Sequence, residues 1–182
     1  MMPIMSGTHT LGPENATLRI KTKRHGAAAK AGHDLLIEVG TWEGTLEVGE
    51  QGPVSLGLGA DSGSMKVIEG TGGVMALTEE DKAEIKKTLE DEVLPAGRVE
   101  FESSQIIPAS DEERFSVSGE LAMNGKRHPL GCELSLGRDG EITGRATVKQ
   151  SDWGIKPYSG LFGTLKVRDE IEVIAEGSLP AR

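Results

Sequence analysis

The chain has 182 residues, a length typical of one domain, and its 20 Lys and Arg against 29 Asp and Glu give a formal net charge of −9. Such an acidic chain lacks the basic face that nucleic acids and anionic lipid headgroups require, so composition argues against both. Hydrophobic residues make up 36%, and with the 25 Gly the apolar fraction approaches the globular average. We therefore expect one domain over residues 1–182, with a buried core and many turns.

The only cysteine, Cys132, excludes an intramolecular disulfide and a cysteine-based zinc site. The first ten residues lack the charged and apolar regions of a secretion signal. No run approaches the ~20 apolar residues that span a membrane. These features favour a cytoplasmic protein that is not an integral membrane protein.

Alternation of apolar and polar residues predicts mainly strands. It is clear at 18–23, 42–48, 99–102, 115–123, 128–136, 142–148 and 167–176, and weaker at 35–39, 54–58 and 64–68. Asn124-Gly125 favours a tight hairpin because both residues accept a positive φ, and a second turn is expected at 138–140. Residues 115–149 are thus predicted to be a three-stranded antiparallel meander.

One segment has helical spacing instead. Thr78 is a candidate N-cap before three acidic residues, and Ile85, Leu89 and Val93 recur every four residues before Pro95. This pattern predicts an amphipathic helix at about 78–94. Because strands and helix do not alternate, a parallel α/β fold is disfavoured. Closure into a barrel would remove the exposed edges of so many strands, although composition does not decide between a barrel and a sandwich.

Five stretches carry a resemblance to a known family: 8–13, 98–104, 117–130, 150–155 and 169–173. Their order and spacing resemble the opening strand, the F-x-S strand, the long hairpin, the corner and the closing strand of the YceI-like family. This resemblance implies a mainly β, lipocalin-like antiparallel barrel of about eight strands or more. It also implies polyisoprenoid binding, with an isoprenoid or isoprenoid-quinone type lipid inside the barrel.

On this basis we expect non-enzymatic binding or carriage of a hydrophobic small molecule or lipid, with no cofactor. The inward residues expected to contact it are Leu18, Ile20, Val99, Phe101, Phe115, Val117, Leu121, Leu134, Ile142, Ala146 and Val148. The same residues could instead fill the core completely. A ligand-free acidic interaction or stress-related module is the alternative, and a small-molecule enzyme is disfavoured because no catalytic constellation is visible. An exposed edge or the helix would also allow a homodimer.

The remaining candidate residues have ordinary structural interpretations beside the functional ones. The four histidines show no metal-ligand spacing, so no metal site is expected. In the pair His33-Asp34 the carboxylate could orient the imidazole, although a loop pair that caps the following strand is favoured. Cys132 lies on the same face of its predicted strand as Leu130 and Leu134, so it is expected to be a buried small apolar residue. The segment 151–163 is expected to form a long connection, with Trp153 as a plug and with Tyr158 and Phe162 at the rim.

Overall fold

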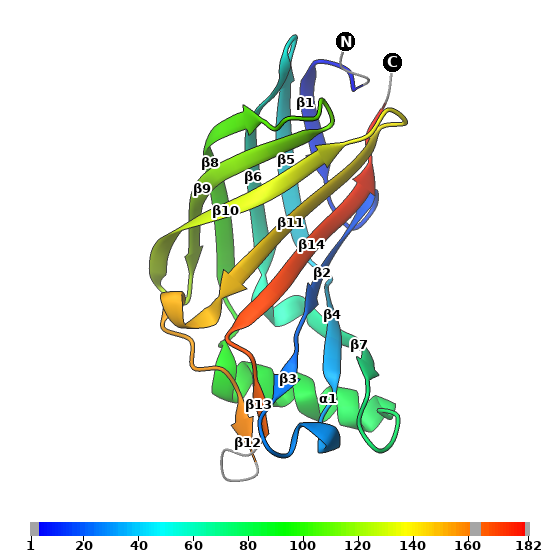
Figure 1. Cartoon of the computed structure of the whole chain (residues 1–182), viewed down its shortest axis with the longest axis vertical. Coiled ribbons are helices and arrows are strands. Elements are labelled where there is room, and N and C mark those ends of the chain that lie inside the picture. The colour runs from blue at the N-terminus through cyan, green and yellow to red at the C-terminus, as the bar shows by residue number, and fades with distance from the viewer. Residues whose placement is uncertain (1–3, 161–164, 181–182) are drawn as a thin grey trace.

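The structure, a computed structural model, describes residues 4–160 and 165–180. Its strands wrap into an elongated, curled antiparallel sheet whose lower end faces the helix (Figure 1). The strands of this sheet are β1 (Gly7–Leu11), β2 (Ala16–Lys21), β4 (Asp34–Val39), β5 (Trp42–Gly49), β6 (Gly52–Asp61), β7 (Met65–Thr71), β8 (Arg98–Pro108), β9 (Arg114–Met123), β10 (Lys126–Leu136), β11 (Glu141–Lys149) and β14 (Glu170–Ser178).

These strands are hydrogen-bonded in the order β1-β5-β6-β8-β9-β10-β11-β14-β2-β4-β7. Three pairs of consecutive strands, β1 with β2, β4 with β5 and β6 with β7, are segments of single bent paths that stay paired along their length. With each bent path counted once, the eleven strands occupy eight positions. The pairing then returns from β14 to β2, which closes the circuit. The predicted lipocalin-like antiparallel barrel is confirmed.

Two adjacent bends divide the barrel into an upper and a lower part. The chain turns at Gly40-Thr41 between β4 and β5, and at the short helix η2 (Ser62–Ser64) between β6 and β7. The Gly40 N–H donates to the Ser64 carbonyl at 3.1 Å, and the Thr41 N–H donates to Ser64 Oγ at 2.9 Å. A Cβ at Gly40 would lie only 3.3 Å from that carbonyl oxygen, so glycine permits the close approach.

The predicted meander is present as β9, β10 and β11. Asn124 and Gly125 have φ values of 55° and 72°, as a tight hairpin turn requires, and they join Met123 to its partner Lys126. The weaker predictions at 35–39, 54–58 and 64–68 are also confirmed, as parts of β4, β6 and β7, although Ser64 still belongs to η2. Alternation therefore located strands even where it was short.

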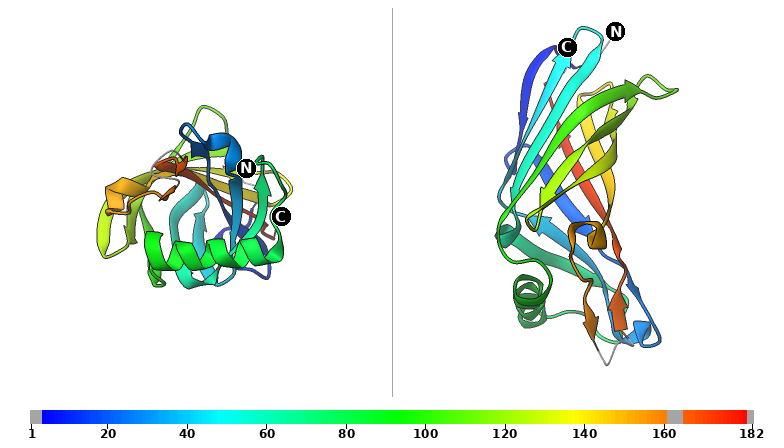
Figure 2. Two further views of the ribbon diagram at one scale, coloured as in Figure 1. Left: turned by 90° about the horizontal axis from the view of Figure 1, so that it is seen from below. Right: turned by 90° about the vertical axis from the view of Figure 1, so that its left-hand side faces the viewer.

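The predicted helix begins at its expected cap. In α1 (Glu79–Thr88) the Asp81 N–H donates to Thr78 Oγ1 at 3.1 Å, and the Thr78 N–H donates to Asp81 Oδ2 at 2.9 Å. This reciprocal capping box satisfies two N–H groups that a helix start leaves free. A π-helical turn, η3 (Leu89–Val93), continues the helix up to Leu94. Figure 2 shows α1 lying across the lower end of the barrel.

The last predicted strand is wrong in one respect, because 167–176 is not continuous. It is split into β13 (Leu165–Val167) and β14, with Arg168 and Asp169 between them. The Asp169 carbonyl and carboxylate accept from the N–H groups of Gln150 and Ser151 at 2.9 and 2.8 Å, which breaks the ladder there. β13 pairs instead with β12 (Ser159–Gly160) and β3 (Arg24–His25), in a small separate sheet below the barrel.

The upper end of the barrel, which holds the β5–β6 hairpin, is filled by side chains. The buried apolar residues there are Ile4, Leu46, Val48, Phe115, Val117 and Leu136. Buried apolar side chains of this size each stabilise the fold by about 1.5–3 kcal/mol relative to exposure. The barrel is therefore closed by its own core at this end.

Candidate functional site

Below this packed end the barrel contains a cavity of about 830 Å³. Its walls are inward-facing side chains of β2, β4, β6, β8, β9, β10, β11 and β14, and α1 covers its lower side. Most of these side chains are aliphatic. A volume of this size is typical of sites that enclose a small organic ligand.

Most of the residues predicted to face the interior line this cavity. They are Leu18, Ile20, Val99, Phe101, Leu121, Leu134, Ile142, Ala146 and Val148. Phe115 and Val117 do not, because they lie in the packed upper end, with exposed fractions of 4% and 2%. The alternation of β9 is the same on both sides of that boundary, so sequence parity alone does not distinguish core from cavity wall.

Small residues leave room on one wall. Gly144, Ala146 and Ala175 line the cavity on the adjacent strands β11 and β14. A Cβ added at Gly144 would meet only the Ala175 Cβ, at 4.0 Å, so the space in front of it is open. Gly119 on β9 leaves no such room, because a Cβ there would collide with the Glu102 carbonyl and the Phe101 ring. Gly119 therefore serves close packing.

The apolar face of the helix forms part of the same cavity. Ile85, Leu89 and Val93, the stripe found in the sequence, line it together with Leu77 just before the helix. All four are half-buried. Sequence reasoning identified the stripe but did not assign it to the binding site, although its amphipathic spacing was the signal that could have done so.

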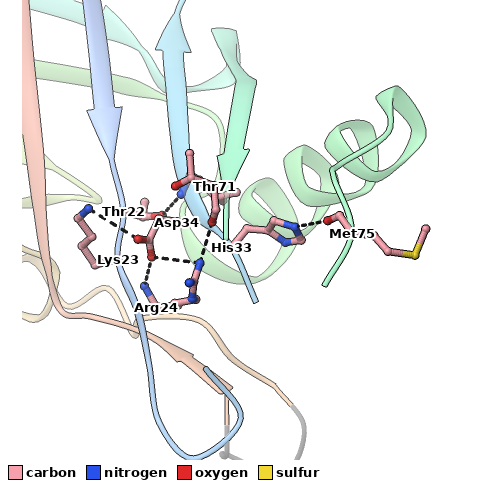
Figure 3. Close-up of polar contacts among 8 residues, drawn as sticks. Thr22, Lys23, Arg24, His33, Asp34, Thr71 and Met75 are labelled. Atoms are coloured by element: carbon pink, nitrogen blue, oxygen red, sulfur yellow. Dashed lines mark hydrogen bonds and ion pairs between the residues drawn. The ribbon is translucent and has the colours of Figure 1, made fainter. Parts of the chain in front are cut away.

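A polar network lies at the lower rim, where His33 and Asp34 point in different directions (Figure 3). Asp34 Oδ1 accepts from the Arg24 N–H at 2.9 Å, and Asp34 Oδ2 lies 3.6 Å from Lys23 Nζ. His33 Nε2–H donates to the Met75 carbonyl at 2.7 Å instead. Asp34 thus does not orient the His33 imidazole, and the interpretation as a loop pair at the start of a strand is correct.

The segment after β11 supplies one buried and one rim residue. Trp153 is 1% exposed and contacts His128 edge to face, with ring centroids 5.1 Å apart. It packs in the core without lining the cavity, as expected for a plug. Tyr158 lines the cavity at its lower rim. Phe162, the other expected rim residue, lies outside the described residues.

Cys132 also lines the cavity. Burial raises the pKa of its thiol to about 11, because the apolar surroundings disfavour the thiolate. The thiolate is the nucleophilic form, so this environment suppresses its reactivity. Over residues 4–160 and 165–180, no group of three or more His, Cys, Asp or Glu is placed to hold a metal ion. In the same part of the chain, no helix is long and apolar enough to cross a membrane.

A family model described as "YceI-like domain" matches residues 10–179. The chain belongs to the YceI-like family. The resemblance seen in the sequence is thereby confirmed, and the YceI-like family is a family of binding proteins.

Solved structures share the YceI-like fold at low identity. Burkholderia cenocepacia BcnA is 14% identical with a TM-score of 0.63, over 88% of this chain and 94% of that one. A mutant Campylobacter jejuni YceI protein, solved with a monobromobimane guest structure, is 13% identical with a TM-score of 0.54, over 80% and 84%. No curated protein matches the chain.

The YceI-like motifs meet at one corner of the barrel. Trp153, from the motif at 150–155, receives at its carbonyl a hydrogen bond of 3.0 Å from Asn124 Nδ2, in the hairpin motif. Ser151 N–H, from the same motif, donates to Asp169 in the closing-strand motif. Residues of three family motifs therefore hold this corner of the barrel together, while most of the side chains that line the cavity are aliphatic.

Proposed function

We propose that this protein is a non-enzymatic carrier that holds a long apolar lipid of the isoprenoid or isoprenoid-quinone type inside its barrel. The observation that carries the proposal is the 830 Å³ aliphatic cavity, closed above by core side chains and covered below by α1. Each methylene transferred from water into such a cavity contributes about 0.8 kcal/mol. A long unbranched or methyl-branched chain is therefore bound through the apolar surface that it buries, without directed hydrogen bonds.

The shape of the cavity favours a chain over a compact molecule. It extends from Leu134 and Ile142, below the packed end, past Val99 and Ile171 to the helix. At its lower rim the cavity is lined by the polar side chains of Arg24 and His33, and Arg145 and Glu176 border it on β11 and β14. An amphipathic lipid would thus place its tail upwards and its polar group at the rim.

The alternatives receive less support. The first alternative is a core filled completely by the protein's own side chains, and this applies only to the upper end of the barrel. Catalysis would need an activated nucleophile or a paired acid and base, and the one thiol in the cavity is held protonated by burial. A purely acidic interaction module would not require the cavity. Three statements stay predictions: the protein uses no cofactor, it can form a homodimer, and it resides in the cytoplasm.

Mass spectrometry of organic extracts from the purified protein tests the proposal. We expect one class of long-chain apolar lipid at a molar ratio approaching one. A delipidated sample should also take up a fluorescent isoprenoid, such as dansyl-labelled geranylgeraniol, saturably. Extracts without lipid, together with no saturable uptake of the probe, would reject the carrier function.

A further inference from the structure

The loop between β7 and α1 exposes two large apolar side chains. Val74 is 85% exposed and Met75 is 78% exposed, more than any other large apolar residue described in the structure. Figure 3 shows the Met75 side chain pointing away from the strands. Exposed large apolar side chains that adjoin one another mark a candidate site of contact with a membrane or a partner.

The same two residues belong to the wall of the cavity. Val74, Met75, Ala76 and Leu77 all line it, so apolar surface is continuous from the barrel interior to the outside of this loop. Figure 1 shows the loop at the lower end of the molecule, beside α1 and away from both termini. The loop therefore lies where an apolar chain would pass in or out.

The backbone of the loop is held so that these side chains project outwards. Gly72 and Gly73 both have positive φ, of 80° and 71°, and a Cβ at Gly73 would collide with the His33 ring. On one side Arg24 Nη1 donates to the Thr71 carbonyl at 2.7 Å, and on the other His33 donates to the Met75 carbonyl. Thr78 then starts the helix. Both ends of the exposed pair are anchored, while their side chains are left free.

We infer that Val74 and Met75 dock the mouth of the barrel onto a neutral lipid bilayer, from which the apolar ligand is collected or to which it is delivered. This inference rests on the proposed function, because a ligand of that kind is dissolved in membranes and hardly at all in water. Two side chains form too small a patch for a stable protein interface, whereas brief insertion into a bilayer needs no more. The net charge of −9 and the acidic start of α1 disfavour an anionic surface.

Docking is tested first without any cargo. A nitrobenzoxadiazole fluorophore is attached through Met75→Cys, and in a matched control through Val54→Cys. Val54 is 64% exposed but lies near the β5–β6 hairpin, at the opposite end of the barrel. Labelling at neutral pH selects the exposed cysteine over Cys132, and a mass spectrum verifies a single label.

With phosphatidylcholine vesicles we expect the fluorescence to rise and shift to the blue at position 75 and to stay unchanged at position 54. Replacing a third of the lipid by phosphatidylglycerol should weaken the signal. No change at position 75, or equal changes at both positions, would overturn the inference. A signal that appears only with anionic vesicles would overturn it as well, since a charged surface would then be the target.

Transfer of dansyl-labelled geranylgeraniol from the protein to the vesicles gives the second readout. For Val74→Ser with Met75→Ser we expect the rate of transfer to the vesicles to be about tenfold lower. Because both residues also line the cavity, the equilibrium dissociation constant of the probe is measured for each variant. Weaker binding alone would speed release, so slower transfer reports the loss of docking. The control pair, Val54→Ser with Ile107→Ser, should transfer like the parent protein. An unchanged rate in the loop variant would contradict docking. Failure of the parent protein to bind the probe would reject the carrier function, while the cargo-free measurement would still decide the docking.

Discussion

Trp153 and Leu121 are joined by a hydrogen bond of 2.8 Å, from the indole Nε1–H to the backbone carbonyl oxygen. The bond is buried, and it connects the corner after β11 to the end of β9. Leu121 lines the cavity with its side chain while its carbonyl is occupied by Trp153. Leu121 thus contributes its side chain to the cavity wall and its carbonyl to the hydrogen bond with Trp153 that holds this part of the wall in place.

We expect Trp153→Phe to lower the free energy of unfolding by about 1–3 kcal/mol, because a buried carbonyl loses its donor. Urea unfolding followed by circular dichroism measures this. Tyr158→Phe, an aromatic substitution in the same segment, is the control and should change stability little. If Trp153→Phe lowers the free energy of unfolding no more than the control does, the Trp153–Leu121 hydrogen bond does not stabilise the barrel.

Gly144→Leu should fill the cavity without strain, since the space in front of Gly144 is open. We expect co-purifying lipid and probe binding to be lost, with the melting temperature equal to or above that of the parent. The matched control is Gly131→Leu on β10, which places the same side chain on the exposed outer face. Lipid content that is the same in both variants would mean that the ligand does not lie along β11.

Val117→Phe and Val148→Phe insert the same extra volume on either side of the boundary between core and cavity. Val117 lies in the packed upper end, where overpacking costs about 1–3 kcal/mol. Val117→Phe should therefore unfold at a lower midpoint concentration of urea than the parent protein. Val148 lines the cavity and should accept the ring while ligand capacity falls. Equal stability losses in the two variants would contradict the division of the barrel into a filled and a hollow end.

Cys132 offers a chemical test of the cavity. With a thiol pKa of about 11, only roughly a thousandth of the thiol is ionised at pH 8, and alkylation by iodoacetamide should accelerate roughly tenfold per pH unit up to pH 10. Bound lipid should slow the reaction further by covering the sulfur. The control is the same protein in urea, which should react much faster at pH 8. Rapid alkylation of the folded protein at pH 7 would contradict the burial.

The start of α1 should respond to acid. The hydrogen bonds that Asp81 receives from the Thr78 backbone and hydroxyl lower the pKa of the Asp81 carboxyl below its ordinary value. The carboxylate therefore stabilises the folded helix fully at neutral pH, and this contribution is lost as the pH falls below about 4. Asp81→Asn should raise hydrogen exchange of the α1 amides at pH 7 and have less effect at pH 3. Glu80→Gln, which leaves the capping box in place, should change exchange less at pH 7.

Local chemistry made most of the fold predictable. The Asn124-Gly125 turn and the Thr78 cap depend on the φ values and side chains of a few adjacent residues, and both appear as expected. Strand alternation likewise follows from having one face towards the barrel interior. Each of these signals is complete within a short window of sequence.

Features that depend on contacts across the closed barrel could not be predicted from such short stretches of sequence. Whether Phe115 or Val148 faces the cavity is decided by what lies across the barrel, which the sequence of one strand does not contain. The break at Asp169 requires the N–H groups of Gln150 and Ser151, brought in from another segment. The same holds for Leu77, whose contribution to the cavity depends on where the helix lies.

The pairing of β14 with β2 has a consequence for synthesis of the chain. Leu18 lies opposite Ala175, so the barrel circuit is completed only by contacts between the two ends of the sequence. Such distant pairing folds slowly, because the intervening chain must be ordered first. During translation β2 is synthesised early and can pair with β4, but its other edge stays unpaired until β14 has been synthesised. The nascent protein should therefore need a chaperone or rapid release more than a helical protein of this length, and premature termination before Glu170 should yield an aggregating product.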